Sequence, residues 1–225
     1  MKVLIVEIVP FISETIRDIL KYFRDDNINA RFKVSVENDF EIAYSNVKRE
    51  NLYDYYFINF YSNSYQAMTF KEKSIITYDE KLALWIRKHY PEAKLGIITG
   101  ITSKYRLVEI FKKFNPDVFL IKQETWLADL SKMAFDISLG RKYFSPMLKN
   151  IISMKFDTDY GRIDHLDMRI VYHLSNGCPT NQLPEFVPLT ISGIEKRKRK
   201  LAKLFGLSTS KSFEIVRAAR NRGVL

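Results

Sequence analysis

The stretch Tyr55-Tyr56-Phe57-Ile58-Asn59-Phe60 decides the fold of the first part of this 225-residue chain, because it is apolar at every position but one. A short apolar run without alternation is typical of a strand buried on both faces, and such strands belong to parallel sheets covered by helices. Four more segments of the chain have strand-like patterns. They are residues 3–6, 32–36, 94–99 and 118–121.

Helical periodicity separates these strands. Apolar residues recur at intervals of three and four in five segments, namely 12–23, 40–47, 79–89, 106–114 and 125–139. Asp39 is the expected N-cap of the second of these helices. Because parallel strands need crossover connections, we expect an α/β domain with a five-stranded, doubly wound parallel sheet in the flavodoxin-like order. The connection 61–78 is long for such a unit and is either an ordered insertion or a flap.

The rest of the chain shows only helical patterns. Four short helices are expected, over residues 163–175, 181–187, 192–204 and 211–220. Gly177 and Gly206 follow the first and third helices, where a C-terminal glycine belongs, and Thr190 is the expected N-cap of the third. We therefore predict a domain over residues 1–140, a linker over 141–162 and a small all-α domain over 163–225.

Charge is distributed unevenly along the chain. The whole sequence carries a net charge of +10, and its last 37 residues, Leu189 to Leu225, hold ten basic and only two acidic residues. This end therefore carries +8, and residues 1–188 carry +2. A concentrated basic segment favours an anionic partner such as nucleic acid.

Several classes of function are disfavoured by composition. The one cysteine, Cys178, excludes an intramolecular disulfide framework, and the three histidines have no metal-ligand spacing. No apolar run is long enough to span a membrane, and the first residues lack the features of a signal peptide. We expect a cytoplasmic protein without cofactor or metal, and no spacing of residues indicates an enzyme.

The strand ends of the first 148 residues resemble the receiver domain of two-component response regulators. Residues 2–7 resemble its first strand, which leads into an acidic pair, and 54–59 its third, which ends at the phosphoacceptor aspartate. Residues 97–100 resemble the strand with the switch hydroxyl, and 119–122 the strand that ends at the active-site lysine. The resemblance implies a pocket formed by Glu7, Ile8, Asn59, Thr99, Phe119 and Lys122.

This pocket departs from the family pattern in its acids. Asn59 stands where the nucleophilic aspartate is expected, and Ile8 replaces one of the two acids that would hold Mg²⁺. Asp54 lies at the opposite end of its strand, about 16 Å away. We expect a pseudo-receiver in which Lys122 hydrogen-bonds to Asn59 or pairs with Glu7. The alternatives are that these residues are only scaffold, or that the cavity binds a small ligand or anion.

The last 63 residues resemble the helix-turn-helix output domain of the LuxR/NarL type, although Pro184 and Pro188 depart from its pattern. Residues 194–206 resemble its recognition helix, so the resemblance implies that this helix enters the major groove of duplex DNA. On a helical wheel Ile194, Leu201, Leu204 and Phe205 face inward. The expected DNA-binding residues are Thr190, Ser192, Glu195, Lys196, Arg197, Arg199, Lys200 and Lys203.

Individual roles can be assigned within this set. Glu195 is expected to accept from cytosine N4, and Lys196 and Arg199 to donate to guanine or phosphate. Arg197 and Lys200 flank the groove-facing stripe and suit phosphates. Lys198 lies near the apolar face, with its stem along the core and its ammonium at the rim. A solvated helix face, an anionic lipid surface and RNA are the alternative readings of this basic run.

The leading hypothesis is a DNA-binding transcriptional regulator that works as a homodimer, because one small helix-turn-helix makes few contacts and paired half-sites supply the rest. A sensor kinase or another signalling protein is a further expected partner. A second hypothesis is a signalling adaptor that acts through protein contacts of the pseudo-receiver. A third is a receiver that is phosphorylated on an unexpected acceptor.

Overall fold

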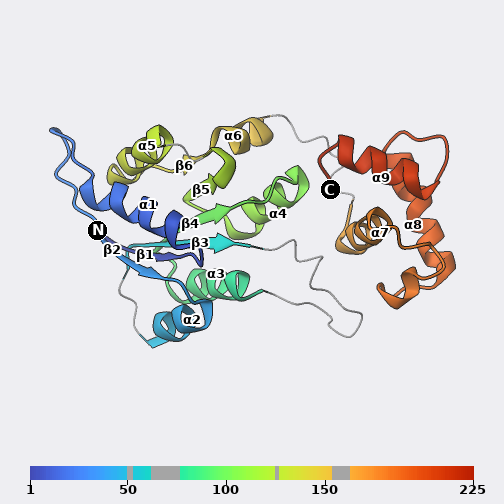
Figure 1. Cartoon of the computed structure of the whole chain (residues 1–225), viewed down its shortest axis with the longest axis horizontal. Helices are drawn as coiled ribbons and strands as arrows, with labels where there is room; N and C mark the ends of the chain where they lie inside the picture. The colour runs from blue at the N-terminus through green and yellow to red at the C-terminus, as the bar shows by residue number, and fades with distance from the viewer. Residues whose placement is uncertain (50–52, 62–76, 125–126, 154–162) are drawn as a thin grey trace. The chain divides into compact units, whose positions relative to one another are not determined.

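A computed structural model describes residues 1–49, 53–61, 77–124, 127–153 and 163–225. The chain divides into two compact units. The first holds the whole β-sheet, and the second holds the helices from α7 onwards (Figure 1). Within these ranges no helix is both long enough and apolar enough to cross a membrane. The long connection 61–78 lies almost entirely outside the described residues.

The first unit is built on a parallel sheet of six strands in the order β2-β1-β3-β4-β5-β6. The first five strands follow the predicted flavodoxin-like order, so the predicted fold class is confirmed. The central strands β1, β3, β4 and β5 are apolar and buried, as their sequence patterns indicate. The strands are β1 (Lys2–Val6), β2 (Lys33–Glu37), β3 (Tyr55–Phe60), β4 (Lys94–Thr99), β5 (Val118–Ile121) and β6 (Tyr143–Phe144).

Helices cover both faces of this sheet. The helices around the sheet are α1 (Pro10–Tyr22), α2 (Phe40–Arg49), α3 (Tyr78–His89), α4 (Lys104–Phe114), α5 (Leu127–Ser138) and α6 (Pro146–Ser153), with a 3-10 turn η1 (Lys122–Glu124) after β5. The start of α4, up to Glu109, and the last two residues of α6 are grouped with the second unit. Helices α1 and α5 pack on one face, and α2 and α3 lie together on the other (Figure 1). The predicted cap is confirmed, since Asp39 Oδ1 accepts from the amides of Glu41 and Ile42 at 2.8 and 2.9 Å.

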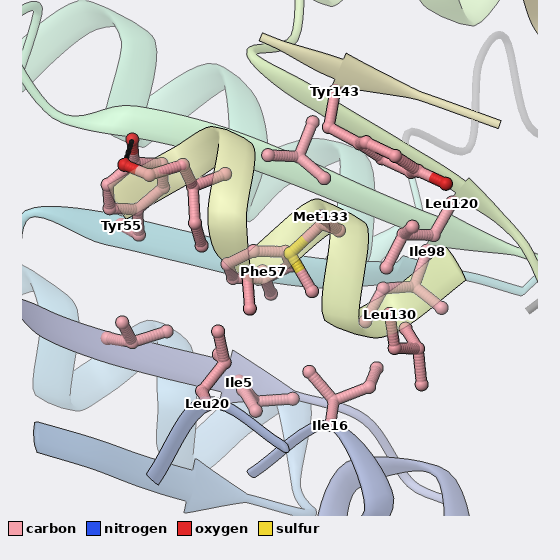
Figure 2. Packing of buried hydrophobic residues seen from close by; sticks show 14 of the residues in the cluster. Ile5, Ile16, Leu20, Tyr55, Phe57, Ile98, Leu120, Leu130, Met133 and Tyr143 are labelled. Atoms are coloured by element: carbon pink, nitrogen blue, oxygen red, sulfur yellow. Dashed lines mark hydrogen bonds between the residues drawn. The ribbon is translucent and has the colours of Figure 1, made fainter. Parts of the chain in front are cut away.

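The main core lies between α1, α5 and the sheet. Figure 2 shows this cluster, in which Leu20 of α1 and Met133 of α5 meet strand residues such as Phe57. Phe57 is fully buried, and its ring lies over Gly96 of the neighbouring strand. A Cβ at Gly96 would stand 2.6 Å from Phe57 Cδ1, so this close approach requires glycine. The packing holds the strands in register and so fixes the edge where their carboxyl ends meet.

The segment predicted as a linker begins with ordered structure. Tyr143 and Phe144 form β6, which pairs in parallel with β5, and α6 follows directly. The sheet therefore has one strand more than the five predicted, and the first unit extends past residue 140. Two residues are too short a run for any periodicity, so the sequence pattern does not predict this strand, and its pairing with β5 shows it.

The second unit contains α7 (His165–Ser175), a 3-10 turn η3 (Leu183–Glu185), α8 (Ile191–Leu204) and α9 (Ser212–Asn221). It also includes the segment Thr102–Glu109, which holds the start of α4. Its interior has two hydrophobic clusters, one around Leu201 and Ile215 and the other around Ile170 and Ile194. The second predicted helix is reduced to the turn η3, with Pro184 in its first residues, where proline is tolerated.

Local signals placed the ends of these helices correctly. The predicted C-terminal glycines Gly177 and Gly206 have φ angles of +83° and +64°, which glycine adopts without strain. Thr190 is the N-cap of α8, and its hydroxyl accepts from the Gly193 amide at 3.2 Å. The first residues of α8 are therefore fixed in the position that the sequence predicts.

Candidate functional site

The predicted pocket residues lie on the carboxyl edge of the sheet. Val6 is paired with Ile58, so Glu7 and Asn59, the residues that follow them, stand side by side at the ends of β1 and β3. Lys122 follows β5 directly. Parallel strands bring their carboxyl ends to one edge, which is why three residues so far apart in the chain meet here.

The carboxylate of Glu7 is the centre of this pocket. Glu7 is completely buried, and Lys122 Nζ lies 2.9 Å from its Oε2. The amide Nδ2 of Asn59 donates to Oε1 at 3.0 Å, and the backbone amide of Val9 donates to the same oxygen at 2.9 Å. Of the two arrangements expected for Lys122, the structure shows the ion pair with Glu7. A buried carboxylate needs such partners because it has lost its hydration.

Tyr61 completes the pocket and was not predicted. Its hydroxyl donates to Glu7 Oε1 at 3.0 Å, and Lys122 Nζ lies 4.9 Å from the centre of its ring. Burial and the neighbouring negative charge of Glu7 raise the pKa of Tyr61 to about 12, so the phenol stays protonated and donates at neutral pH. Its position directly after β3 was the available signal, but a strand end alone does not show where a side chain turns.

Three predicted pocket residues lie away from this carboxylate. Thr99 is fully buried, and its hydroxyl donates to the carbonyl of Phe60 at 3.0 Å and accepts from the amide of Ile101 at 3.1 Å. Phe119 is buried within β5, three residues before Lys122, and belongs to the hydrophobic core rather than to the pocket. Ile8 is 45% exposed and brings no oxygen to the site.

The donor set does not fit Mg²⁺, which receiver-type pockets use. Mg²⁺ needs carboxylate oxygens to offset the cost of its dehydration. Glu7 supplies the one carboxylate among the pocket residues named here, and both of its oxygens already have partners. Within the described ranges, no group of three or more His, Cys, Asp or Glu side chains is placed to hold a metal ion.

The second candidate site is the exposed surface of α8. Ile194, Leu201 and Phe205 are buried, as the helical wheel predicts, and Leu204 is partly buried. On the opposite side an exposed stripe follows the helix axis, which we call the basic stripe. It consists of Ser192, Lys196, Arg199 and Lys203. At about 100° per residue these four lie within about 60° of one another, so they form one face.

Arg197 and Lys200, predicted to contact phosphates, are held within the unit by α7. Arg197 Nη1 lies 2.7 Å from Asp164 Oδ2 and 2.8 Å from Asp167 Oδ1. Lys200 Nζ lies 2.6 Å from the other oxygen of Asp167, which is completely buried. Asp164 and Asp167 also form the capping box of α7. These ion pairs join the start of α7 to the middle of α8, so Arg197 has a structural role.

Glu195 is also held by a neighbour on its own helix. Its Oε1 lies 2.9 Å from Lys198 Nζ, and the same ammonium donates to Thr180 Oγ1 at 2.9 Å. Only 7% of the Lys198 side chain is exposed, so its stem lies along the core with the charge at the rim, as predicted. Glu195 is therefore the counter-charge of a buried lysine, a role that the sequence analysis did not foresee.

The ionic contacts at the start of α7 lower the pKa of Asp164. Burial alone acts to raise this pKa, but hydrogen bonds from Arg197 and from the Asp167 amide outweigh it. The pKa of Asp164 is therefore lower than its ordinary value of 3.8. A carboxyl group whose pKa is lowered by folding stabilises the fold above its unfolded pKa, and this stabilisation is lost as the pH falls through the folded value.

The buried ion pair of the pocket yields a first prediction. Lys122→Met leaves the Glu7 carboxylate buried without its cation, and we expect the free energy of unfolding of the first unit to fall by about 3 kcal/mol. Urea unfolding followed by tryptophan fluorescence measures this change, since Trp85 lies in α3. The exposed Lys88→Met is the matched control, with an expected change within about 0.5 kcal/mol.

A double variant tests the cause of this loss. Glu7→Gln combined with Lys122→Met removes both charges, and we expect it to recover most of the stability lost in Lys122→Met. A Lys122→Met variant as stable as the wild type would show that the pair does not support the fold.

The ionic contacts of Arg197 yield a second prediction. Arg197→Met removes its hydrogen bonds to Asp164 and Asp167, and we expect the second unit to lose about 1.5–3 kcal/mol of stability at neutral pH. Since the pKa of Asp164 lies below 3.8, the difference from the wild type should shrink only when the pH falls below that value. Thermal unfolding followed by circular dichroism measures both effects.

Arg199→Met is the control for that prediction, because Arg199 is exposed on the same helix. If both variants lose the same stability, or if the Arg197→Met difference does not change with pH, the ionic explanation is wrong.

The structure of this chain is similar to solved structures of the response regulator RcsB. No protein-family model and no curated protein matches the sequence. The response regulator RcsB, solved as a complex with DNA, matches with a TM-score of 0.58 and 14% identity over 98% of both chains. RcsB from Salmonella enterica serovar Typhimurium, bound to promoter P1flhDC with the phosphomimetic BeF3-, matches with a TM-score of 0.59 and 14% identity. That match covers 100% of this chain and 99% of the other.

A third RcsB structure, with two dimers bound to two parallel DNAs, has a TM-score of 0.58 and 15% identity over 98% of each chain. The likeness extends over both units, and at these identities it describes the fold. The chain therefore has the fold of a two-component response regulator, with a receiver-like α/β unit followed by a helix-turn-helix unit.

Proposed function

We propose that this chain is a DNA-binding transcriptional regulator that inserts α8 into the major groove of duplex DNA. The observation that carries the proposal is the basic stripe of α8, which stays exposed while the opposite face of the helix forms the core. A helix that presents its first residues to base edges is the reading element of helix-turn-helix proteins. The DNA bound in the RcsB structures supports the same use of this fold.

The start of α8 is suited to that role. Thr190 caps the helix, and its Oγ1 lies 3.1 Å from Ser192 Oγ, so these contacts fix the conformation of the first turn. Lys196 and Arg199 follow one and two turns later on the same face. Lys203, near the C-terminal end of α8, is suited to a phosphate.

We further propose that the protein binds DNA as a homodimer. One helix of 14 residues reads only a few base pairs, so tight specific binding needs a second half-site. The face of α9 around Phe213, which is 62% exposed, and Arg217, whose guanidinium lies 5.6 Å from the centre of the Phe213 ring, is one candidate surface for pairing. The dimers in one of the RcsB structures are consistent with this arrangement.

The receiver-like unit is proposed not to use an acyl phosphate at the usual position. Asn59 carries a carboxamide, which is a poor nucleophile, and its nitrogen donates to Glu7. Lys122, which would contact the phosphoryl group, is already paired with Glu7 at 2.9 Å. The input to this regulator, such as contact with a signalling protein, would then act without chemistry at Asn59.

Binding to duplex DNA tests the role of the basic stripe. We expect Lys196→Ala and Arg199→Ala, made in the full chain, each to weaken binding, by about tenfold where the residue contacts a base. Each variant that loses a phosphate contact should also reduce the slope of log K against log salt by about 1. Fluorescence anisotropy with labelled duplexes at several salt concentrations measures both quantities.

The matched control is Lys88→Ala, which removes one exposed positive charge from the first unit. Equal effects of Lys88→Ala and Lys196→Ala would mean that only net charge matters. Unchanged binding by both stripe variants would contradict the assignment of α8, and would favour an adaptor that acts through protein contacts of the first unit.

Phosphorylation of the first unit is tested with a small phosphodonor. After incubation with acetyl phosphate and Mg²⁺, we expect intact-mass spectrometry to show no phosphorylated form of this chain, because Asn59 offers no carboxylate to attack phosphorus. A receiver domain with an intact aspartate serves as the positive control. An acyl phosphate mapped to any aspartate of this chain would contradict the proposal.

A further inference from the structure

The chemistry of the basic stripe indicates which bases it reads. Resting on the function proposed above, we propose that α8 recognises half-sites through the major-groove edges of guanines, contacted by Lys196 and Arg199. In this proposal Glu195 takes no part in base recognition, because it neutralises Lys198.

The basic stripe offers donors almost exclusively. Lys196, Arg199 and Lys203 are permanent donors without acceptor capacity, and Ser192 adds one hydroxyl. Asn and Gln, which recognise adenine through a paired donor and acceptor, are absent from α8. Guanine is the base that presents two acceptors, O6 and N7, in the major groove, so it is the partner that matches these side chains.

Glu195 is the one acid of α8 and so the one charged acceptor on it for cytosine N4. Its carboxylate lies 2.9 Å from the ammonium of Lys198, whose side chain is only 7% exposed. A charge with so little contact with water depends on its counter-ion, because desolvation would otherwise disfavour the charged form. Releasing Glu195 to a base would leave Lys198 with the neutral hydroxyl of Thr180 as its contact in this structure.

The positions of these residues on the helix also separate Lys196 and Arg199, which face outward, from Glu195. Lys196 and Arg199 lie near the middle of the exposed face, whereas Glu195 lies toward its edge, about 70° from the middle of the basic stripe at about 100° per residue. The glutamate is also only 39% exposed, and its contact with Lys198 is a one-turn pair along the helix. Both observations direct the carboxylate toward the core side of α8 and away from the groove.

Selection from a random duplex library with the full chain is the first part of the test. We expect the enriched half-sites to contain fixed G·C pairs. Arg199→Ala and Lys196→Ala should each remove the preference at one position, with Kd for the selected duplex rising roughly 5- to 150-fold. Glu195→Gln should select the same site as the wild type, and Lys88→Ala is the charge-matched control.

Base analogues then separate contacts to guanine from contacts to its paired cytosine. Replacing the fixed guanines by 7-deazaguanine removes the N7 acceptor and leaves cytosine unchanged. We expect this replacement to weaken binding by the wild type and by Glu195→Gln alike, and to have a smaller effect on the variant whose contact is already missing.

Three outcomes would overturn the inference. They are half-sites with fixed A·T pairs in place of G·C, a changed site in Glu195→Gln while circular dichroism shows the fold intact, and binding that does not respond to 7-deazaguanine. Each of these outcomes leaves duplex binding in place, so the proposed function survives. Failure of the wild type to bind any duplex would instead reject the proposed function together with this inference.

Discussion

A buried charge needs a partner, and both candidate sites of this protein are arranged by that constraint. Glu7 is completely buried at the carboxyl edge of the sheet, with Lys122 at 2.9 Å and three hydrogen-bond donors on its other oxygen. In a pocket of the receiver type a lysine and several carboxylates would share a metal ion and a phosphoryl group. Here Asn59 and Ile8 bring no carboxylate, and the carboxylate of Glu7 pairs with the ammonium of Lys122. The ion pair and the hydrogen bonds to Glu7 thus join the ends of β1, β3 and β5.

The same constraint divides the five consecutive basic residues of α8 into two groups. Arg197 and Lys200 form ion pairs with the buried carboxylate of Asp167, and Lys198 forms one with Glu195. Lys196 and Arg199 point away from the core and stay exposed. Helical geometry makes this division possible, because neighbours in the sequence point about 100° apart and face different surroundings. The inward group fixes the position of α8 against α7, and the outward group is free for a ligand.

Most of the fold could be predicted from the sequence, because the apolar pattern and the glycine and cap positions carry that information. Three strands, Tyr55–Phe60, Lys94–Thr99 and Val118–Ile121, begin and end at the predicted residues. The sixth strand was missed since two residues show no period. Within the sites, the meeting of Glu7, Asn59 and Lys122 followed from parallel topology. Tyr61 and the pairing of Glu195 with Lys198 depend on side-chain rotamers, which no sequence pattern specifies.

Part of the positive charge at the end of the chain is neutralised by ion pairs within the second unit. The last 37 residues carry +8, which taken alone indicates many contacts with an anionic partner. Three of their ten basic residues, Arg197, Lys198 and Lys200, are paired with carboxylates inside the unit. Counter-ion release depends on the cations that reach phosphates and not on the formal charge, so the number of usable contacts is smaller than the sequence suggests. If α8 enters the groove as proposed, the cations available to DNA are those on its outer face, Lys196, Arg199 and Lys203. The pairing of Arg197, Lys198 and Lys200 therefore reduces the charge that α8 can offer to a ligand and leaves a defined set of exposed donors.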